Sequence, residues 1–207
     1  MNESPPTVFL VDDDPAVRDA VGLLLRAGGL TVEGFANAAE FLATDAVRRP
    51  GCLVLDVRMP EMSGLDLQKK LRNDGYPMPI IFMTGHGDVP MAIRAMKAGA
   101  LDFIEKPFSG ELLLTRVYEA LAIDARDRCR QAQREAAATR LSRLSPRERE
   151  VLDRVADGQY NKTIAAELDI SISTVEIHRR RAMEKLEATS IADLIRTLAL
   201  ANDQAAR

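Results

Sequence analysis

Short apolar runs alternate with amphipathic stretches along the first part of the chain. Five runs have the length and bounds of buried strands, at residues 8–11, 31–35, 52–55, 80–83 and 101–104. Between and after them, apolar positions recur at helical spacing over residues 16–27, 38–47, 64–72, 89–97 and from 111 onward. This alternation predicts an α/β domain built on a doubly wound, five-stranded parallel sheet with helices on both faces.

The last part of the chain shows helical spacing only. Four helices are predicted there, at residues 146–156, 161–168, 173–186 and 191–200. Ser145 and Pro146 are a suitable N-cap and first helical residue, and Ser173 or Thr174 is expected to cap the third helix. A short helix, a tight turn and a second helix with a polar face are typical of a helix-turn-helix.

A helical linker is expected between these two parts. Residues 122–143 contain no Gly or Pro, so we predict an α/β domain over residues 1–123, a linker over 124–143 and an all-α domain over 144–207. Small residues recur at helical spacing in the linker, at Ala125, Cys129, Ala132 and Ala136. We favour a solvated helix over a coiled-coil dimer contact, which the same spacing would allow.

Charge differs between the two ends of the chain. Residues 1–125 carry 12 basic and 18 acidic side chains, a balance of −6, whereas residues 126–207 carry 16 and 13, a balance of +3. The two parts are therefore expected to meet different partners, with nucleic acid suited to the basic part. No apolar run is long enough to span a membrane and residues 1–7 do not resemble a secretory signal, so a cytoplasmic location without membrane contact is expected. The two Cys and two His are too scattered for a zinc site or a disulfide framework.

Residues with unusual chemistry follow four of the predicted strands. Three acids (Asp12, Asp13 and Asp14) follow the first strand, Asp56 the third, Thr84 the fourth and Lys106 the fifth. In an open parallel sheet, ligands bind outside the carboxyl ends of the strands, so these side chains are expected to converge. Carboxylates gathered at one edge repel unless a hard cation joins them, and Mg²⁺, or Mn²⁺ in its place, accepts such oxygen ligands. A carboxylate there could form an acyl phosphate, with the Lys106 ammonium and Thr84 hydroxyl offsetting charge on the phosphoryl group.

These residues have two other interpretations. Aspartates often cap helices after a strand, and Asp14 before Pro15 fits that role, although capping does not explain four strand ends together. Phosphatases and phosphotransferases also use a strand-end Asp, but they need a second Asp two residues on. Arg58 occupies that position, so no general acid is available, and an enzyme with its own substrate is disfavoured.

The strand-end motifs resemble those of a known family, the response regulators of two-component systems. The resemblance is carried by residues 11–14 (VDDD), 55–64 (LDVRMPEMSG), 84–88 (TGHGD) and 103–108 (FIEKPF), and covers residues 7 to about 123. It implies a flavodoxin-like receiver domain in which Asp56 accepts a phosphoryl group from a sensor histidine kinase, with hydrolysis as the only other reaction. The implied metal site comprises Asp12, Asp13, Asp56 and the backbone carbonyl of Arg58.

The same resemblance assigns a switch. It implies that Thr84 moves to contact the phosphoryl group, that Lys106 pairs with it, that Phe103 turns inward, and that the bond between Lys106 and Pro107 is cis. Arg58 and His86 flank the site and are candidates for tuning the lifetime of the phosphoryl group.

The third helix of the all-α domain is the expected DNA reader. Val175, Met183 and Leu186 face inward by spacing, which leaves cationic side chains on the outer surface. Residues 144–152 (LSPREREVL), 161–165 (NKTIA) and 173–178 (STVEIH) resemble the LuxR-type DNA-binding domain, and with the receiver the chain resembles the FixJ/NarL class of regulators. Many relatives carry Lys at the position of Glu176, so their base preference is not transferred. The candidate DNA contacts are Lys162, Thr163, Thr174, Glu176, Ile177, His178, Arg179, Arg180, Arg181 and Lys185.

These observations predict a phosphorylation-activated transcriptional regulator that binds double-stranded DNA as a homodimer, with RNA polymerase as a further partner. The dimer face is expected around Met91 to Phe103, and a palindromic operator follows from twofold symmetry. Two rivals are a constitutive DNA-binding protein with an inactive receiver and an adaptor that binds only proteins. The complete acidic set argues against the first, and Arg179 to Arg181 argue against the second.

Overall fold

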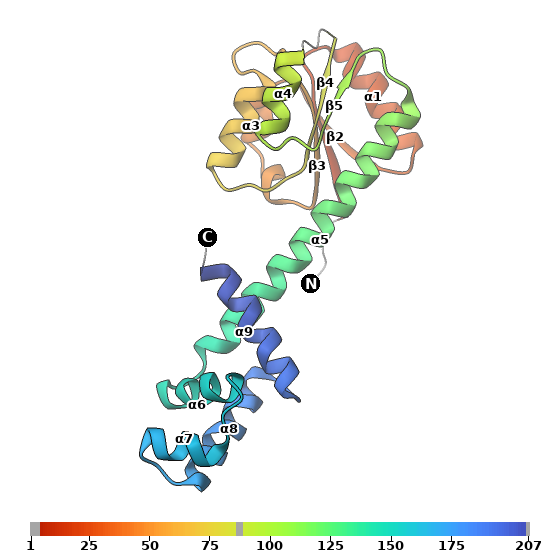
Figure 1. Ribbon diagram of the computed structural model, residues 1–207. Helices are drawn as coiled ribbons and strands as arrows, with labels where there is room; N and C mark the ends of the chain where they lie inside the picture. The colour runs from red at the N-terminus through yellow and green to blue at the C-terminus, as the bar shows by residue number, and fades with distance from the viewer. Residues whose placement is uncertain (1–4, 86–88, 206–207) are drawn as a thin grey trace. The chain divides into compact units, whose positions relative to one another are not determined.

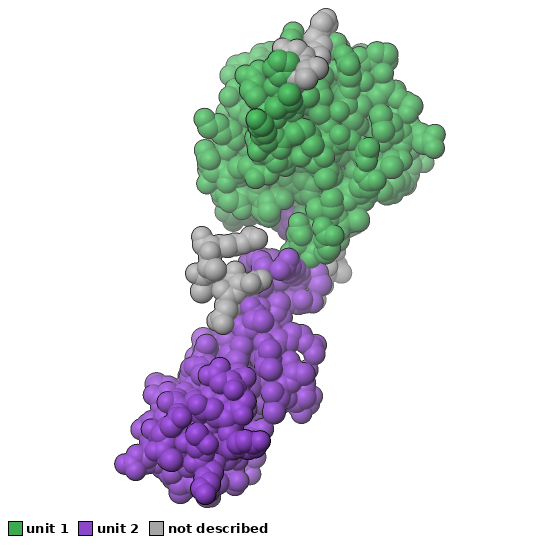
Figure 2. All heavy atoms as spheres, viewed as in Figure 1, with its two compact units in different colours: residues 1–127 green, residues 128–207 purple. Residues whose placement is uncertain are grey.

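The computed structural model describes residues 5–85 and 89–205, and in it the chain forms two compact units (Figure 2). The first unit covers residues 1–127 and the second residues 128–207. Each is described by itself below, and the boundaries inferred from sequence, 1–123, 124–143 and 144–207, stay a prediction. None of the described helices is long and apolar enough to cross a membrane.

The first unit contains one five-stranded sheet (Figure 1). Its strands are β1 (Thr7–Val11), β2 (Thr31–Phe35), β3 (Gly51–Asp56), β4 (Ile80–Thr84) and β5 (Asp102–Glu105). All neighbouring strands pair in parallel, in the order β2-β1-β3-β4-β5. The predicted doubly wound parallel sheet is confirmed, and each of the five strands lies at or within one residue of its predicted position.

Helices cover both faces of this sheet. On one face lie α1 (Pro15–Ala27) and α5 (Gly110–Ser142); on the other lie α2 (Ala38–Leu42), α3 (Gly64–Asn73) and α4 (Val89–Lys97). Alternate residues of each strand face opposite sides, so the sheet has two hydrophobic cores. One core contains Phe9, Phe41 and Phe82, and the other contains Leu10, Ile81 and Leu113.

One predicted helix is shorter than the spacing indicated. Residues 38–47 were expected to form a single helix, but α2 ends at Leu42 and a separate 3₁₀ turn, η1, covers Ala46–Arg48. Thr44 explains the break, because its hydroxyl donates to the carbonyl of Phe41 and accepts from the amide of Ala46. Such local side-chain bonds compete with the helical backbone pattern.

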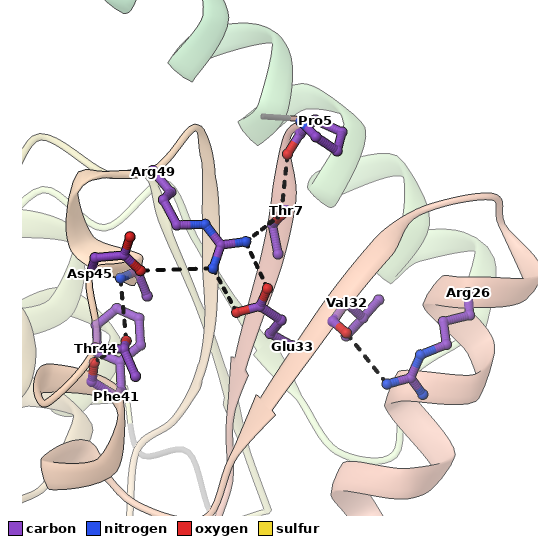
Figure 3. Close-up of polar contacts among 10 residues, drawn as sticks. Pro5, Thr7, Arg26, Val32, Glu33, Phe41, Thr44, Asp45 and Arg49 are labelled. Carbon is purple, nitrogen blue, oxygen red and sulfur yellow. Dashed lines mark hydrogen bonds and ion pairs between the residues drawn. The ribbon is translucent and has the colours of Figure 1, made fainter. Parts of the chain in front are cut away.

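The edge strand β2 is tied to the segment before β3 by a polar cluster (Figure 3). Arg49 donates two hydrogen bonds to Glu33, at 2.6 and 2.9 Å, and a third to Thr7 Oγ1 at 3.3 Å. Its guanidinium also lies 5.3 Å from the centre of the Phe9 ring. The paired hydrogen bonds to Glu33 and the contact with the Phe9 ring together fix the edge strand β2 against β1 and the core beneath it.

The described residues of the second unit form helices joined by short turns. The linker helix α5 ends at Ser142, and α6 (Pro146–Ala156), α7 (Asn161–Leu168), α8 (Ile172–Leu186) and α9 (Ile191–Ala205) follow. Ser145 and Glu148 form a capping box at the start of α6. The core contains Leu152, Ile164, Val175 and Leu194 among other apolar residues.

The cap of α8 differs from the sequence prediction. Ser171, rather than Ser173 or Thr174, is the N-cap, and its hydroxyl accepts a hydrogen bond from the amide of Thr174. The left-handed conformation of Asp169 ends α7 early enough for the chain to re-enter a helix at Ile172. Ser173 and Thr174 therefore lie within the first turn.

The small residues of the linker lie on the surface of α5. Ala125, Cys129, Ala132 and Ala136 are all exposed, whereas Arg134 and Ala137 are buried. The buried side of α5 in this segment is therefore the side that carries Arg134 and Ala137, and the four small residues lie outside it.

Candidate functional site

The strand order places the candidate site where the sheet topology reverses. β1 and β3 are neighbours, and the connections from them leave toward opposite faces of the sheet. Ligands of open α/β sheets bind at the carboxyl ends of strands at such a switch point. Asp12 directly follows β1 and Asp56 is the last residue of β3, so both carboxylates lie at this point.

Lys106 joins these two carboxylates. Its Nζ lies 2.8 Å from Asp12 Oδ2 and 2.8 Å from Asp56 Oδ1. The second oxygen of each acid is held by the backbone, because Asp12 Oδ1 accepts from the Asp14 amide and Asp56 Oδ2 accepts from the Arg58 amide. Only 1% of Asp12 and 7% of Asp56 is exposed, so the chain buries two acids around one ammonium group.

Burial and charge act in opposite directions on this cluster. Burial raises the pKa of Asp12, although the hydrogen bond from Lys106 opposes that effect. Burial by itself would lower the pKa of Lys106, but its hydrogen bonds to Asp12 and Asp56 outweigh burial and raise it. Lys106 therefore remains a cation in the pocket, and Asp12 holds a proton more readily than an exposed aspartate.

The other predicted receiver residues lie in different surroundings. Thr84 ends β4 and is 1% exposed, and its carbonyl accepts from the Lys106 amide at 2.7 Å. Phe103 is partly buried on β5, with its ring 6.3 Å from that of Phe82. The bond between Lys106 and Pro107 is cis, as the resemblance implied. His86 lies outside the described residues.

The predicted metal ligands are only partly brought together. Asp12 and Asp56 share Lys106, whereas Asp13 is exposed, and no three His, Cys, Asp or Glu of residues 5–85 and 89–205 gather closely enough to hold a metal ion. The chemistry of the donors nevertheless fits a hard divalent cation, since two buried carboxylates outnumber the single ammonium between them and Asp13 is next in sequence. Receiver domains in general bind Mg²⁺ at such a pocket, and the specific set of Asp12, Asp13, Asp56 and the Arg58 carbonyl stays a prediction.

Two residues that position the site were not singled out from sequence. The Arg18 guanidinium donates to the backbone carbonyl of Asp12 at 2.6 Å and so helps to hold the loop after β1. Gly64 begins α3 beside Asp56, where a Cβ would lie 2.2 Å from the Asp56 backbone oxygen. The only sequence signal for Gly64 is its place in the motif at residues 55–64, and nothing local to Arg18 indicates its partner.

The candidate DNA-binding residues divide into two groups. Eight of them, Lys162, Thr163, Thr174, Glu176, Ile177, His178, Arg180 and Arg181, have exposed or partly exposed side chains on α7 and α8. The other two bond to neighbouring helices of the same unit. Arg179 donates to Asn161 Oδ1 at 3.3 Å, and Lys185 Nζ lies 2.6 Å from Glu148 Oε2.

The contact between Lys185 and Glu148 is largely internal to the second unit. The side chain of Glu148 is 5% exposed and that of Lys185 40%. The hydrogen bond from Lys185, together with those from Ser145, lowers the pKa of Glu148 despite its burial. The sequence reveals the capping role of Glu148 three residues after Ser145, but not its partner 37 residues later.

Comparison with known proteins covers both units. Residues 8–118 match the family described as response regulator receiver domain, and residues 142–198 match bacterial regulatory proteins of the luxR family. The response regulator protein TmoT of Ectopseudomonas mendocina is 46% identical over 196 residues, which are 95% of this chain and 89% of that protein. The transcriptional regulatory protein FixJ of Azorhizobium caulinodans is 45% identical over 201 residues, or 97% and 95% of the two chains.

Solved structures give the same result. A low-resolution structure of the response regulator StyR is 43% identical, with a TM-score of 0.88 over 95% of this chain and 99% of that one. Full-length FixJ from B. japonicum is 40% identical, with a TM-score of 0.59 over 96% and 98% of the two chains.

Proposed function

This chain belongs to the response regulators that join a receiver domain to a luxR-family DNA-binding domain, and we propose that Asp56 is the residue through which phosphorylation controls its binding to DNA. Members of this class are transcriptional regulators rather than enzymes that turn over a separate substrate. The observation that carries the proposal is the direct contact of Asp56 with Lys106 at the switch point of the sheet.

In the proposed reaction, an oxygen of Asp56 bonds to phosphorus while the bond from phosphorus to the donor nitrogen of a sensor histidine kinase breaks. The Arg58 amide donates to one Asp56 oxygen and Lys106 to the other, so the carboxylate is oriented before the reaction. The Lys106 ammonium then offsets negative charge as it develops on the phosphoryl oxygens. Hydrolysis of the acyl phosphate returns the free carboxylate.

A divalent cation would be held by Asp12, Asp13, Asp56 and the Arg58 carbonyl, and when bound it supplies charge neutralisation at the phosphoryl oxygens. This chain contributes the burial of Asp12 and the fixed position of its carboxylate. Both are supported by the bonds from Lys106 and the Asp14 amide.

A phosphoryl group carries a charge of about −1.5 to −2. It replaces the single charge of the ionised Asp56 carboxylate, so the pocket becomes more negative and the contacts of Lys106 and Thr84 change. The Lys106 ammonium contacts both Asp12 and Asp56. A phosphoryl group on Asp56 would therefore compete with the Asp12 carboxylate for this ammonium. Thr84 would turn its hydroxyl to the phosphoryl group, and Phe103 would enter the space beside Phe82. These different contacts in the two states are what allow a phosphoryl group to shift the equilibrium.

The output proposed for this switch is a dimer that forms through the face around Met91 to Phe103. Ile93 and Met96 are large apolar side chains that are 48% and 45% exposed on this face. Two DNA-binding units would then meet half-sites about one helical turn apart on a palindromic operator. The regulator would act in the cytoplasm on DNA and contact RNA polymerase there.

On α8, the exposed residues Glu176, Arg180 and Arg181 are the proposed direct DNA contacts. Arg179 and Lys185 would contribute mainly by holding α8 against α7 and α6, because each already bonds within the unit.

Incubation with acetyl phosphate and Mg²⁺, followed by intact mass measurement and DNA titration, tests the proposal. The native protein should gain one phosphoryl group and bind DNA more tightly, whereas Asp56→Asn should do neither. Asp66→Asn is a matched control, because Asp66 is exposed on α3 and should leave labelling unchanged. Equal labelling of native protein and Asp56→Asn would place the acceptor elsewhere.

A further inference from the structure

Helix α4 is held to the first unit by few buried side chains. Among its side chains that the structure describes, Ala95 alone is buried, and Ile93 and Met96 are exposed. Met91 is partly buried against the same core as Ala95, so the apolar area that α4 removes from water is modest. Polar contacts must therefore contribute much of what fixes its position.

Two side chains of α3 supply these polar contacts at the carboxyl end of α4. Gln68 Nε2 donates to the Ala95 carbonyl at 3.1 Å, and Arg72 Nη2 donates to the Gly99 carbonyl at 2.9 Å. Gln68 and Arg72 are four residues apart and thus lie on one face of α3, which runs beside α4 (Figure 1). Donors and a cation at a helix carboxyl end are favourable, because the last carbonyls there lack helical partners.

Gly99 is required for the second contact. Its φ of 83° is left-handed, and a Cβ on it would lie 1.6 Å from Arg72 Nη2. The guanidinium of Arg72 therefore occupies the place that any other residue would fill with its side chain. A glycine at position 99 is therefore needed to leave room for the Arg72 guanidinium.

This arrangement also has an unfavourable feature. Gln68 is 1% exposed, and its Oε1 has no hydrogen-bond partner among the described residues. A buried amide oxygen without a donor destabilises the arrangement that contains it. Next to Arg72, a cavity of about 440 Å³ is lined by Gly99, Ala100 and Leu101, so the segment between α4 and β5 borders space into which it could shift.

We propose that Gln68 and Arg72 are positioning residues of the switch, which hold α4 in the arrangement where Lys106 bonds the free Asp56 carboxylate. Their release favours the rearranged face that binds a second copy of the chain. This inference rests on the proposed function, because α4 and β5 form the proposed dimer face. Phosphorylation of Asp56 and loss of the Gln68 and Arg72 hydrogen bonds act on the same equilibrium. Losing these bonds therefore favours phosphorylation, and phosphorylation favours losing them.

The test compares the native protein with the variant Gln68→Met, Arg72→Met. Met fills a volume similar to Gln without a donor, and the Ala95 carbonyl keeps its bond from the Ala100 amide, so no backbone group of α4 is orphaned. Lys69→Met is the matched control, since Lys69 is exposed on the same helix. The probe is a DNA duplex selected by the phosphorylated native protein from random sequence.

Without a phosphodonor, the double variant should bind this duplex about tenfold more tightly than the native protein, a shift of about 1.4 kcal/mol. After phosphorylation the two should bind equally, and acetyl phosphate should label the variant faster. Lys69→Met should match the native protein in every measurement.

Unchanged basal affinity in a folded variant would overturn the inference, as would an equal loss of affinity in both states, which is the mark of a purely structural contact. If the double variant does not fold, Arg72→Met alone is used, because Arg72 is exposed. Its affinity for the duplex without a phosphodonor should rise about threefold. An unchanged affinity would overturn the inference. Failure of the proposed function gives another pattern, in which the native protein is neither labelled at Asp56 nor changed in DNA affinity.

Discussion

At the scale of single residues, several buried carboxylates lie against a specific cationic partner. Asp12 and Asp56 share Lys106 in the first unit, and Glu148 meets Lys185 in the second. Breaking such a pair by removing one partner is costly, because the remaining charge stays buried. Under the proposed function, the pocket acids and Lys106 take part in phosphoryl transfer, whereas the contact of Glu148 with Lys185 joins α6 and α8.

Glu148 leads to a pH prediction. Its pKa is lowered by folding, so its contribution to stability is complete above the ordinary value of 4.5 and is lost as the pH falls through the lower folded value. Calorimetry of the full chain should show the transition of the second unit moving to lower temperature on acidification below 4.5, and moving less in Glu148→Gln. Equal acid shifts in the two proteins would contradict the assignment.

At the scale of elements, the start of α3 is fixed by its close approach to β3. Gly64 donates its amide to the Val57 carbonyl at 3.0 Å, and its Cα faces the Asp56 backbone with no room for a side chain. The same helix carries Gln68 and Arg72 one and two turns later. The first residue of α3 thus sets both the loop beside Asp56 and the contacts to α4.

The substitution Gly64→Ala should be strongly destabilising. Its Cβ would meet the Asp56 carbonyl at 2.2 Å, which is backbone and cannot rotate away, so we expect a loss of about 1–3 kcal/mol or more in urea unfolding. Gly85→Ala is the control, because a Cβ there meets no atom within 4 Å. Similar unfolding midpoints for the two variants would show that the loop yields.

At the scale of the whole molecule, one helix belongs to both units. α5 runs from Gly110 to Ser142, so it begins in the receiver unit and ends in the DNA-binding unit. In the first unit Asp124 accepts from the Gly51 amide at the start of β3. In the second, Arg140 pairs with Glu187 at the end of α8. Each unit thus holds its own part of α5 by a named polar contact.

Phosphorylation should change the association state of this two-unit chain. Sedimentation of the native protein with acetyl phosphate and Mg²⁺ should show a dimer, because the rearranged face around α4 and β5 binds a second copy. Asp56→Asn should keep the sedimentation of the untreated native protein. A phosphorylated protein that stays monomeric both alone and on its operator would rule out the dimer model.

Sequence alone predicted the parallel sheet, the sequence of strands and helices along the chain, and the convergence of Asp12, Asp56 and Lys106. Strand and helix spacing are local properties, and the rule that parallel strands end at one edge brings Asp12, Asp56 and Lys106 together although 94 residues separate Asp12 from Lys106. Local hydrogen bonds were less well predicted, as Thr44 and Ser171 show by shifting helix ends.

Only the tertiary structure decided which side chains meet across the packed helices. Lys185 faces outward by spacing but bonds Glu148, and Gln68 and Arg72 bond backbone carbonyls 27 residues away. Such pairs depend on how two helix faces are oriented and how far they are apart. No local pattern records that geometry, because it is set by the packing of the cores between the elements.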